Sequence, residues 1–345
     1  MRIGLIMRPT YFCLTTRPFP TTPSTQFYYP AAMHENAVEL LRQTVLDGEG
    51  MATLTGDAGL GKTLVAHLLF ERLGNDSNRS LLTNCRFTER ADLFRAVLFD
   101  LGQTSHGQVE QELRLALTSY LLDQFANGRS TILVLDEAQG LSADILEELR
   151  LLGNLETSRG KAVQIILIGQ TGLDRTLDTP SLLPLQQRLA VRAHLEPLDL
   201  HESCDYLAHQ IRLAGGRPEK IMTDEAMRLV ARTARGIPRL LNRYAYQALV
   251  FAEQASADRV DAEVVIETLS QLGVEPVSND DDVISSTEDS ASAEEHWADR
   301  RVETSGSTLP ANLGAPHLGG RRNPIDSDAP WIAGSGVSFP PPGTP

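Results

Sequence analysis

The sequence is poor in lysine and cysteine, and basic residues are outnumbered. Only 3 of its 345 residues are lysine, and 31 basic against 45 acidic residues give a net charge of −14. That net negative charge argues against binding to nucleic acid through general electrostatic attraction. The cysteines, Cys13, Cys85 and Cys204, are scattered. Their spacing fits neither a disulfide framework nor a zinc site, and favours a reducing compartment.

Segments that would insert into a membrane or direct export are also missing from the sequence. No apolar run approaches the ~20 residues that a membrane helix needs. The apolar stretch at 3–7 is short and is followed at once by Arg8 and Pro9, unlike a secretory signal. HExxH, CxxC and GxSxG motifs do not occur, so a metal-only or nucleophilic enzyme has no support. We therefore expect a cytoplasmic protein that reaches the inner membrane only through a partner.

Composition divides the chain into four parts. Residues 1–30 are rich in Pro, Thr and aromatics, which predicts an irregular arm. Residues 31–198 alternate strand and helix patterns, whereas 199–275 show helical patterns alone, as in a small lid domain. Residues 276–345 hold 11 acidic and 4 basic residues and 9 of the 19 prolines. This composition predicts a disordered tail, either simply solvated or serving as a docking segment.

Alternating apolar runs and helical periodicities predict an α/β fold with a parallel sheet and helices on both faces. The expected strands are 51–55, 81–84, 132–135, 163–168 and 191–195. The expected helices of the core are 31–46, 63–73, 89–101, 108–126 and 142–155, and those of the lid are 200–214, 224–235, 238–254 and 261–272.

The strongest motif is a phosphate-binding loop between an apolar strand and a helix. It reads Gly56-Asp57-Ala58-Gly59-Leu60-Gly61-Lys62-Thr63, a complete GxxxxGK[ST] pattern. Glycines let the backbone N–H groups curl around phosphates, while the lysine reaches the β- and γ-phosphates. The threonine hydroxyl is a ligand for Mg²⁺. The motif predicts a site for ATP and Mg²⁺.

A second motif follows the apolar run 132–135, which ends in Asp136 and Glu137. An acid at the end of such a strand, one strand away from the phosphate loop, is placed beside Mg²⁺. The next acid, Glu137, can polarise an attacking water. Together with the phosphate loop, the pair favours a Mg²⁺-dependent ATPase over a protein that only binds nucleotide.

Polar residues at two later positions are further candidates for contacts with the nucleotide. Gln170 follows the strand at 163–168, where its amide can orient water or touch the γ-phosphate; otherwise it is a turn residue. Arg188 precedes the last strand and can reach a neighbouring subunit's γ-phosphate as an arginine finger. The alternatives are a surface or ion-paired Arg188, or Arg192 as the finger.

The lid carries a third candidate in Gly236-Ile237-Pro238-Arg239. Proline in the first turn fixes the start of the helix and so places Arg239 as a cation over the nucleotide. Arg239 also belongs to a stripe with Arg228, Arg232, Arg235 and Arg243. Such a stripe is either a solvated face or a contact to nucleic acid phosphates.

Taken together, these motifs resemble the AAA+ ATPases of the general secretion pathway protein A type, in the Orc/Cdc6-like branch. The resemblance rests on the phosphate loop, Leu135-Asp136-Glu137-Ala138-Gln139, Ile168-Gly169-Gln170, Gln187-Arg188-Leu189 and Gly236-Ile237-Pro238-Arg239, and covers about residues 9–273. It implies a P-loop NTPase that binds ATP between core and lid and forms a homo-oligomer with ATP. It also implies that Gln170 is the first sensor, Arg188 the finger and Arg239 the second sensor.

The same resemblance suggests partners. Secretion-type members often continue into a membrane segment and a peptidoglycan-binding domain, whereas this sequence continues into the acidic tail. The leading hypothesis is an ATPase that drives assembly or remodelling of a protein client in a secretion, export or polysaccharide system. The alternatives are a DNA-associated ATPase of the transposition-helper type, with nucleic acid not favoured, and a nucleotide-gated binding module with little turnover.

Overall fold

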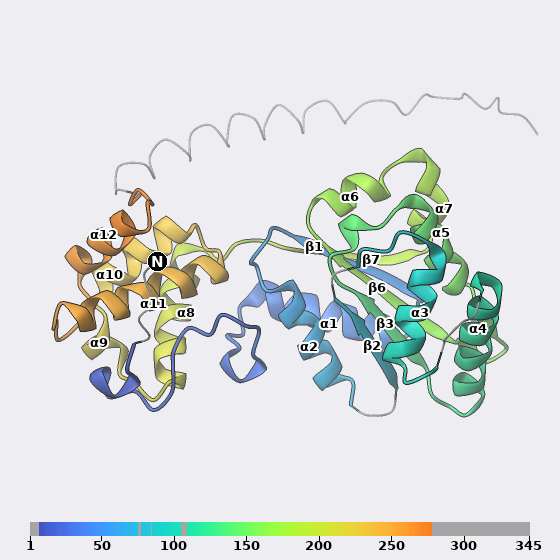
Figure 1. Ribbon diagram of the computed structural model, residues 1–345, viewed down its shortest axis with the longest axis horizontal. Coiled ribbons are helices and arrows are strands. Elements are labelled where there is room, and N and C mark those ends of the chain that lie inside the picture. The colour runs from blue at the N-terminus through green and yellow to red at the C-terminus, as the bar shows by residue number, and fades with distance from the viewer. Residues whose placement is uncertain (1–6, 75–76, 84, 105–108, 278–345) are drawn as a thin grey trace, which may run out of the picture. The chain divides into compact units, whose positions relative to one another are not determined.

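The computed structural model describes residues 7–74, 77–83, 85–104 and 109–277 (Figure 1). A five-stranded sheet with its helices occupies residues up to 195, and a group of helices follows from residue 200. From residue 278 onward, the tail predicted at 276–345 lies outside the described residues. None of the described helices is both long and apolar enough to cross a membrane.

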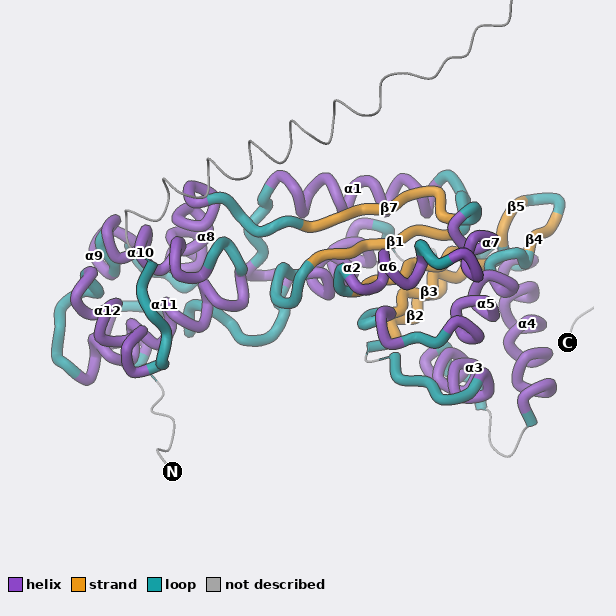
Figure 2. The backbone as a smooth tube through the Cα atoms, turned by 90° about the horizontal axis from the view of Figure 1, so that it is seen from above, coloured by secondary structure: helices purple, strands orange, loops and turns teal. Residues whose placement is uncertain are grey.

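The five strands are parallel and lie in the order β2-β3-β6-β1-β7, with β2 and β7 at opposite edges (Figure 2). Because the strands are parallel, the carboxyl ends of β1, β3 and β6 meet at one edge of the sheet. The strands are β1 Met51–Gly56, β2 Asn78–Leu82, β3 Thr131–Leu135, β6 Val163–Gly169 and β7 Leu189–Leu195. The predicted parallel sheet is confirmed.

Alternate residues of the central strands pack into two different hydrophobic cores, because successive side chains of a strand point to opposite faces of the sheet. Ala52 and Leu54 of β1 pack in the core formed with α1 and α2, whereas Leu133 and Leu135 of β3 pack with α3, α4 and α5. The helices are α1 Ala32–Leu46, α2 Lys62–Arg72, α3 Arg90–Asp100, α4 Glu110–Ala126 and α5 Ala143–Leu152. Helices therefore cover both faces of the sheet, as predicted.

Several predicted bounds were wrong. Strand β7 begins at Leu189 rather than at residue 191, and β2 ends at Leu82 rather than at residue 84. Strand β2 begins at Asn78, three residues before the predicted start, because an edge strand tolerates polar residues such as Arg79. The helix predicted to reach residue 155 ends at Leu152. Three short features were not predicted: α6 Gly172–Leu177, α7 Leu183–Gln186, and the hairpin of β4 Glu156–Thr157 and β5 Gly160–Lys161.

The lid consists of five helices among the described residues, four at the predicted places. Asp199, Thr223 and Asp261 cap three of them by accepting a hydrogen bond from a backbone N–H in the first turn. The helices are α8 Leu200–Leu213, α9 Pro218–Ile221, α10 Asp224–Ala234, α11 Pro238–Gln254 and α12 Ala262–Gln271.

The arm before α1 packs on the lid rather than on the sheet. Phe12, Leu14 and Phe19 are buried in the same hydrophobic core as the lid helices. Polar side chains of the lid also hold the arm: Asn242 Nδ2 donates to the Pro20 carbonyl at 3.0 Å, and Gln210 Nε2 donates to a carbonyl further along the arm. The arm and the lid thus form one packing unit.

Candidate nucleotide site

The loop between β1 and α2 curls through three glycines with positive φ, at positions 56, 59 and 61. Backbone of this kind is rarely adopted by other residues, which is why the motif needs glycine there. Lys62 begins α2, and its Nζ donates to the carbonyls of Gly56 and Asp57, each at 2.8 Å. The ammonium is therefore held over the loop, where phosphates bind in this motif.

Burial and nearby acids act on Lys62 in opposite directions. The side chain is buried, and burial lowers its pKa because the charged form loses hydration. The negative charges of Glu137 and Asp136 favour the charged form and raise the pKa again. Two carboxylates at the carboxyl end of β3 thus help to keep this buried lysine cationic.

Thr63 and Asp136 lie in direct contact across the sheet edge. The Thr63 hydroxyl donates to Asp136 Oδ2 at 2.5 Å, while Asp136 Oδ1 accepts from the Glu137 backbone N–H at 2.9 Å. Hydroxyl and carboxylate oxygens are the hard ligands that Mg²⁺ prefers. Among the described residues, no group of three or more His, Cys, Asp and Glu side chains could hold a metal. The oxygen ligands of this pair fit Mg²⁺, which commonly takes one or two protein ligands and completes its shell with phosphates and water.

Glu137 sits in a left-handed backbone conformation, with φ 59° and ψ 34°. Its exposed side chain accepts a hydrogen bond from Gln139 Nε2 at 2.5 Å. The same amide uses its oxygen to accept from the Gln170 backbone N–H at 3.0 Å. Gln139 was not among the predicted site residues, and its only signal was its place in the motif that begins at Leu135.

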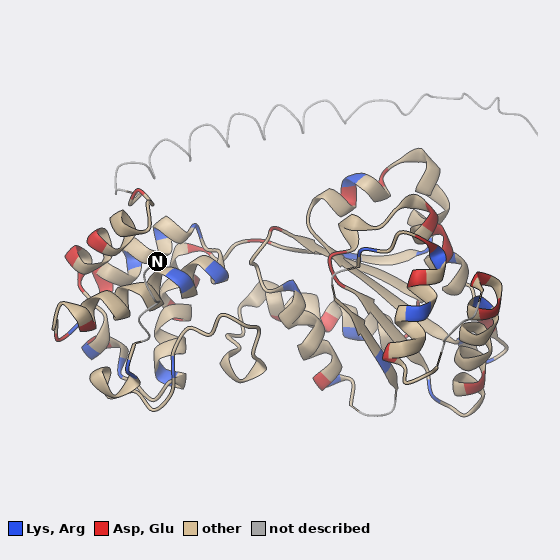
Figure 3. Ribbon diagram, in the orientation of Figure 1, with Lys and Arg blue, Asp and Glu red and all other residues tan. Residues whose placement is uncertain are grey.

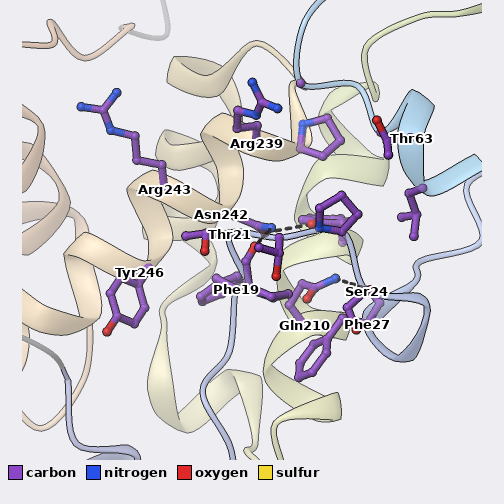
Figure 4. Close-up of a pocket in the computed structure, with 18 of the residues that line it drawn as sticks. Phe19, Thr21, Ser24, Phe27, Thr63, Gln210, Arg239, Asn242, Arg243 and Tyr246 are labelled. Carbon is purple, nitrogen blue, oxygen red and sulfur yellow. Dashed lines mark hydrogen bonds between the residues drawn. The ribbon is translucent and has the colours of Figure 1, made fainter. Parts of the chain in front are cut away.

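A cavity of about 660 Å³ lies beside these residues (Figure 4). Residues from the phosphate loop, the arm and the lid line it together. Of the predicted residues with side-chain roles, it brings together Lys62, Thr63, Glu137, Gln170 and Arg239. The arm residues 17–24 and the lid residues 242 and 243 were missed, because only tertiary packing brings them to the cavity.

The charge of this cavity suits a polyphosphate. Its described lining includes four cationic side chains, Arg17, Lys62, Arg239 and Arg243, but only one acid, Glu137. A concave site lined by one sign of charge concentrates ligands of the opposite sign. Figure 4 shows Arg239 and Arg243 on the lid helix α11, with Thr63 on α2.

Helix α11 touches the phosphate loop directly. The Arg239 backbone N–H donates to the Gly59 carbonyl at 3.2 Å. A Cβ at Gly59 would lie only 3.0 Å from the Arg239 Cβ, so glycine permits this approach. The predicted place of Arg239 at the nucleotide is thus supported by a lid-to-loop contact, although its role remains a prediction.

Arg188 lies away from this cavity. It is exposed, is absent from the cavity lining, and has no ion pair or side-chain hydrogen bond within the described part of the chain. Its rival Arg192 pairs with Asp178 at 2.8 Å, an intramolecular contact. Of the two, only Arg192 has a side-chain partner among the described residues. Its role as a finger remains a prediction.

The arginine stripe of the lid does not form one uniform face. Arg239 and Arg243 line the nucleotide cavity, whereas Arg228 and Arg232 line a separate hollow between α10 and α12. Figure 3 shows acidic residues interspersed with basic ones along the ribbon of the lid helices. The stripe therefore gives little support to a nucleic acid interface.

The fold and the site define a P-loop NTPase of the AAA+ class. Residues 44–177 match the model of the AAA domain. The chain is thus an AAA+ P-loop protein related to general secretion pathway protein A. It is 35% identical to that protein of Aeromonas hydrophila over 248 residues, which cover 71% of this chain and 45% of the relative. The chain therefore spans less than half of that relative's length.

Two solved structures show the same fold. The Cdc6 protein of Pyrobaculum aerophilum superposes with a TM-score of 0.58 at 18% identity, covering 78% of this chain and 72% of the other. The ORC2 protein of Aeropyrum pernix, in its ADPNP-ADP complexes, superposes with a TM-score of 0.57 at 15% identity, covering 73% and 72%. At these identities the likeness concerns the fold alone.

Proposed function

We propose that this chain binds ATP with Mg²⁺ and hydrolyses it. The observation that carries the proposal is the contact between Thr63 and Asp136, next to a cavity that Lys62, Thr63 and Glu137 line. Lys62 binds the β- and γ-phosphates, and Thr63 and Asp136 hold Mg²⁺, which neutralises phosphate charge when bound. Glu137 accepts the proton of the attacking water.

We further propose that hydrolysis drives assembly or remodelling of a protein client by an ATP-bound homo-oligomer. The name of the Aeromonas relative supports a client in a secretion pathway. A client in an export or polysaccharide system is the alternative proposal. The chain would then act on the cytoplasmic side and reach the inner membrane through that client.

Nucleotide binding is tested by Lys62→Ala. Removing the cation should abolish measurable ATP binding in a calorimetric titration, because the loop then lacks the charge that faces the phosphates. Lys220→Ala is the matched control, since Lys220 is exposed on α9 and lies outside the cavity lining. Equal ATP affinity in the two variants would contradict the phosphate-loop assignment.

Hydrolysis is tested by Glu137→Gln. We expect phosphate release to fall by about 10²- to 10⁴-fold with ATP affinity retained, the range for loss of a general base. Glu71→Gln, on the exposed far end of α2, is the control. The retained ATP should also trap the client complex. If the unmodified protein releases no more phosphate than Lys62→Ala, it is a nucleotide-gated binding module instead.

A further inference from the structure

We propose that Gln139 is a positioning residue for hydrolysis, one that fixes the Glu137 carboxylate relative to the end of β6. The inference rests on the proposed ATPase function. Gln139 lies in the short 3₁₀ turn Ala138–Gly140, and its side chain joins two parts of the site, the acid after β3 and the backbone after β6.

The two hydrogen bonds of Gln139 fix the direction of its amide. A carboxylate only accepts, so the amide nitrogen must face Glu137. A backbone N–H only donates, so the amide oxygen must face Gln170. Both contacts are satisfied at 2.5 Å and 3.0 Å, and turning the amide over would break both. The amide thus behaves as a two-ended link.

Without this link, the Glu137 carboxylate would have little to hold it. The side chain is exposed, and Gln139 is its one hydrogen-bonding or ion-pairing partner within the part of the chain that the structure describes. Its backbone is fixed, since its N–H donates to Asp136 and the residue is left-handed. A fixed backbone with a free side chain still leaves several rotamers open. Gln139 selects among them.

The end of β6 is shaped to admit this link. A Cβ at Gly169 would lie 2.9 Å from Gln139 Oε1 and 3.0 Å from Leu173 Cδ2. Glycine therefore leaves the room in which the amide oxygen meets the Gln170 N–H. Gln170 also lines the cavity, so a shift of its backbone when nucleotide binds would move Gln139 and with it the Glu137 carboxylate.

The test is Gln139→Leu, which removes both hydrogen bonds at similar volume. A misplaced general base should lower kcat by roughly tenfold to a hundredfold and leave KM for ATP near its original value. Gln139→Glu keeps the acceptor for Gln170 but sets a like charge against Glu137, so its kcat should fall as well. Gln43→Leu is the control, because Gln43 is a hydrogen-bonded glutamine on the surface of α1.

A double variant separates positioning from general damage. In a Glu137→Gln background, adding Gln139→Leu should change kcat no further, because the amide acts through that carboxylate. Normal turnover by Gln139→Leu, or losses that multiply in the double variant, would overturn the inference alone. A wild-type protein without phosphate release would overturn the proposed function, and this inference with it.

Discussion

At the scale of single residues, His34 stabilises the phosphate loop through a hydrogen bond to its backbone. Its Nε2 lies 2.7 Å from the Leu60 carbonyl, so Nε2 carries the proton and donates it. Its Nδ1 is buried without a hydrogen-bond partner among the described residues. A Cβ at Gly61 would lie 3.3 Å from the ring, which leaves little room for a larger residue. The buried ring therefore suits the neutral form.

This burial predicts acid sensitivity. Burial lowers the pKa of His34 below its ordinary value of 6.5, and the Leu60 hydrogen bond only partly opposes the shift. The unfolded chain then takes up the proton more readily than the folded protein. The stability due to neutral His34 is present above pH 6.5 and is lost as pH falls below it.

We expect His34→Gln to unfold about 1 kcal/mol more easily than wild type near neutral pH, through the lost hydrogen bond. This difference should shrink in mildly acidic buffer, where only the wild type loses stability. Urea midpoints measured across that range check it, with His67→Gln on the exposed side of α2 as the control. A difference that stays constant with pH would contradict the argument.

Sequence reasoning placed the principal site residues because their signal is local. Lys62, Thr63, Asp136 and Glu137 stand in contiguous motifs, and parallel strands bring the ends of such motifs to one edge. Gln139 and His34 could not be placed in this way. Their roles depend on a backbone N–H and a carbonyl that are 31 and 26 residues away in the chain.

At the scale of elements, the turn between α10 and α11 joins the lid to the segment that leaves the sheet. Gly236 has φ +69°, and a Cβ there would lie 1.9 Å from the Leu198 carbonyl oxygen. The Gly236 carbonyl also accepts from the Leu198 N–H at 3.0 Å. Helix α11 begins two residues later at Pro238 and Arg239 follows, so this contact fixes where the Arg239 side chain starts.

Gly236→Ala should therefore cost much more stability than an ordinary glycine replacement. Gly74 is a matched control, since it has the same φ of +69° but nothing within 4 Å of a Cβ. In both variants, alanine in the left-handed conformation costs roughly 1–2 kcal/mol. Only in Gly236→Ala does the new Cβ also clash with the Leu198 backbone. Chemical unfolding should show the larger loss for Gly236→Ala, together with weaker ATP binding. If Gly236→Ala and Gly74→Ala lose the same stability, the backbone at Leu198 moves away from the added methyl group at no energetic cost.

The elements that the sequence predicted are those long enough to show a period. Helices α1, α8 and α11 run for 14 to 17 residues and display a clear apolar face. Helices α7 and α9 have 4 residues each, about one turn, so no period can emerge from them. Helices α7 and α9 form because of tertiary packing, which the local sequence does not indicate.

At the scale of the whole molecule, Arg188 is predicted to act on a second copy of the chain. It is exposed and stands outside the cavity that its own chain forms, while Arg192 is already paired. A cation contributes to hydrolysis where charge develops on the γ-phosphate. We therefore expect Arg188 to serve a neighbouring subunit's nucleotide.

This model predicts that specific ATPase activity rises with protein concentration. Arg188→Ala should cut turnover by about 10³-fold or more while sparing ATP affinity, as for other arginine fingers. Mixing Arg188→Ala with Lys62→Ala should restore part of the activity, since one supplies an intact site and the other a finger. Arg175→Ala, an exposed arginine on α6, is the control. Turnover independent of concentration, with no recovery on mixing, would contradict action between subunits.

The packing of the arm against the lid has a consequence for how the chain is made. Phe12 and Phe19 are synthesised long before α11 and α12, which complete the core that buries them. The Met7 N–H meets the Tyr246 hydroxyl across 239 residues of chain. At roughly 5–20 residues per second, synthesis of that length takes roughly 10 to 50 seconds. The nascent chain thus carries an uncovered aromatic segment until the last lid helices have been synthesised, and an uncovered apolar segment is prone to aggregate.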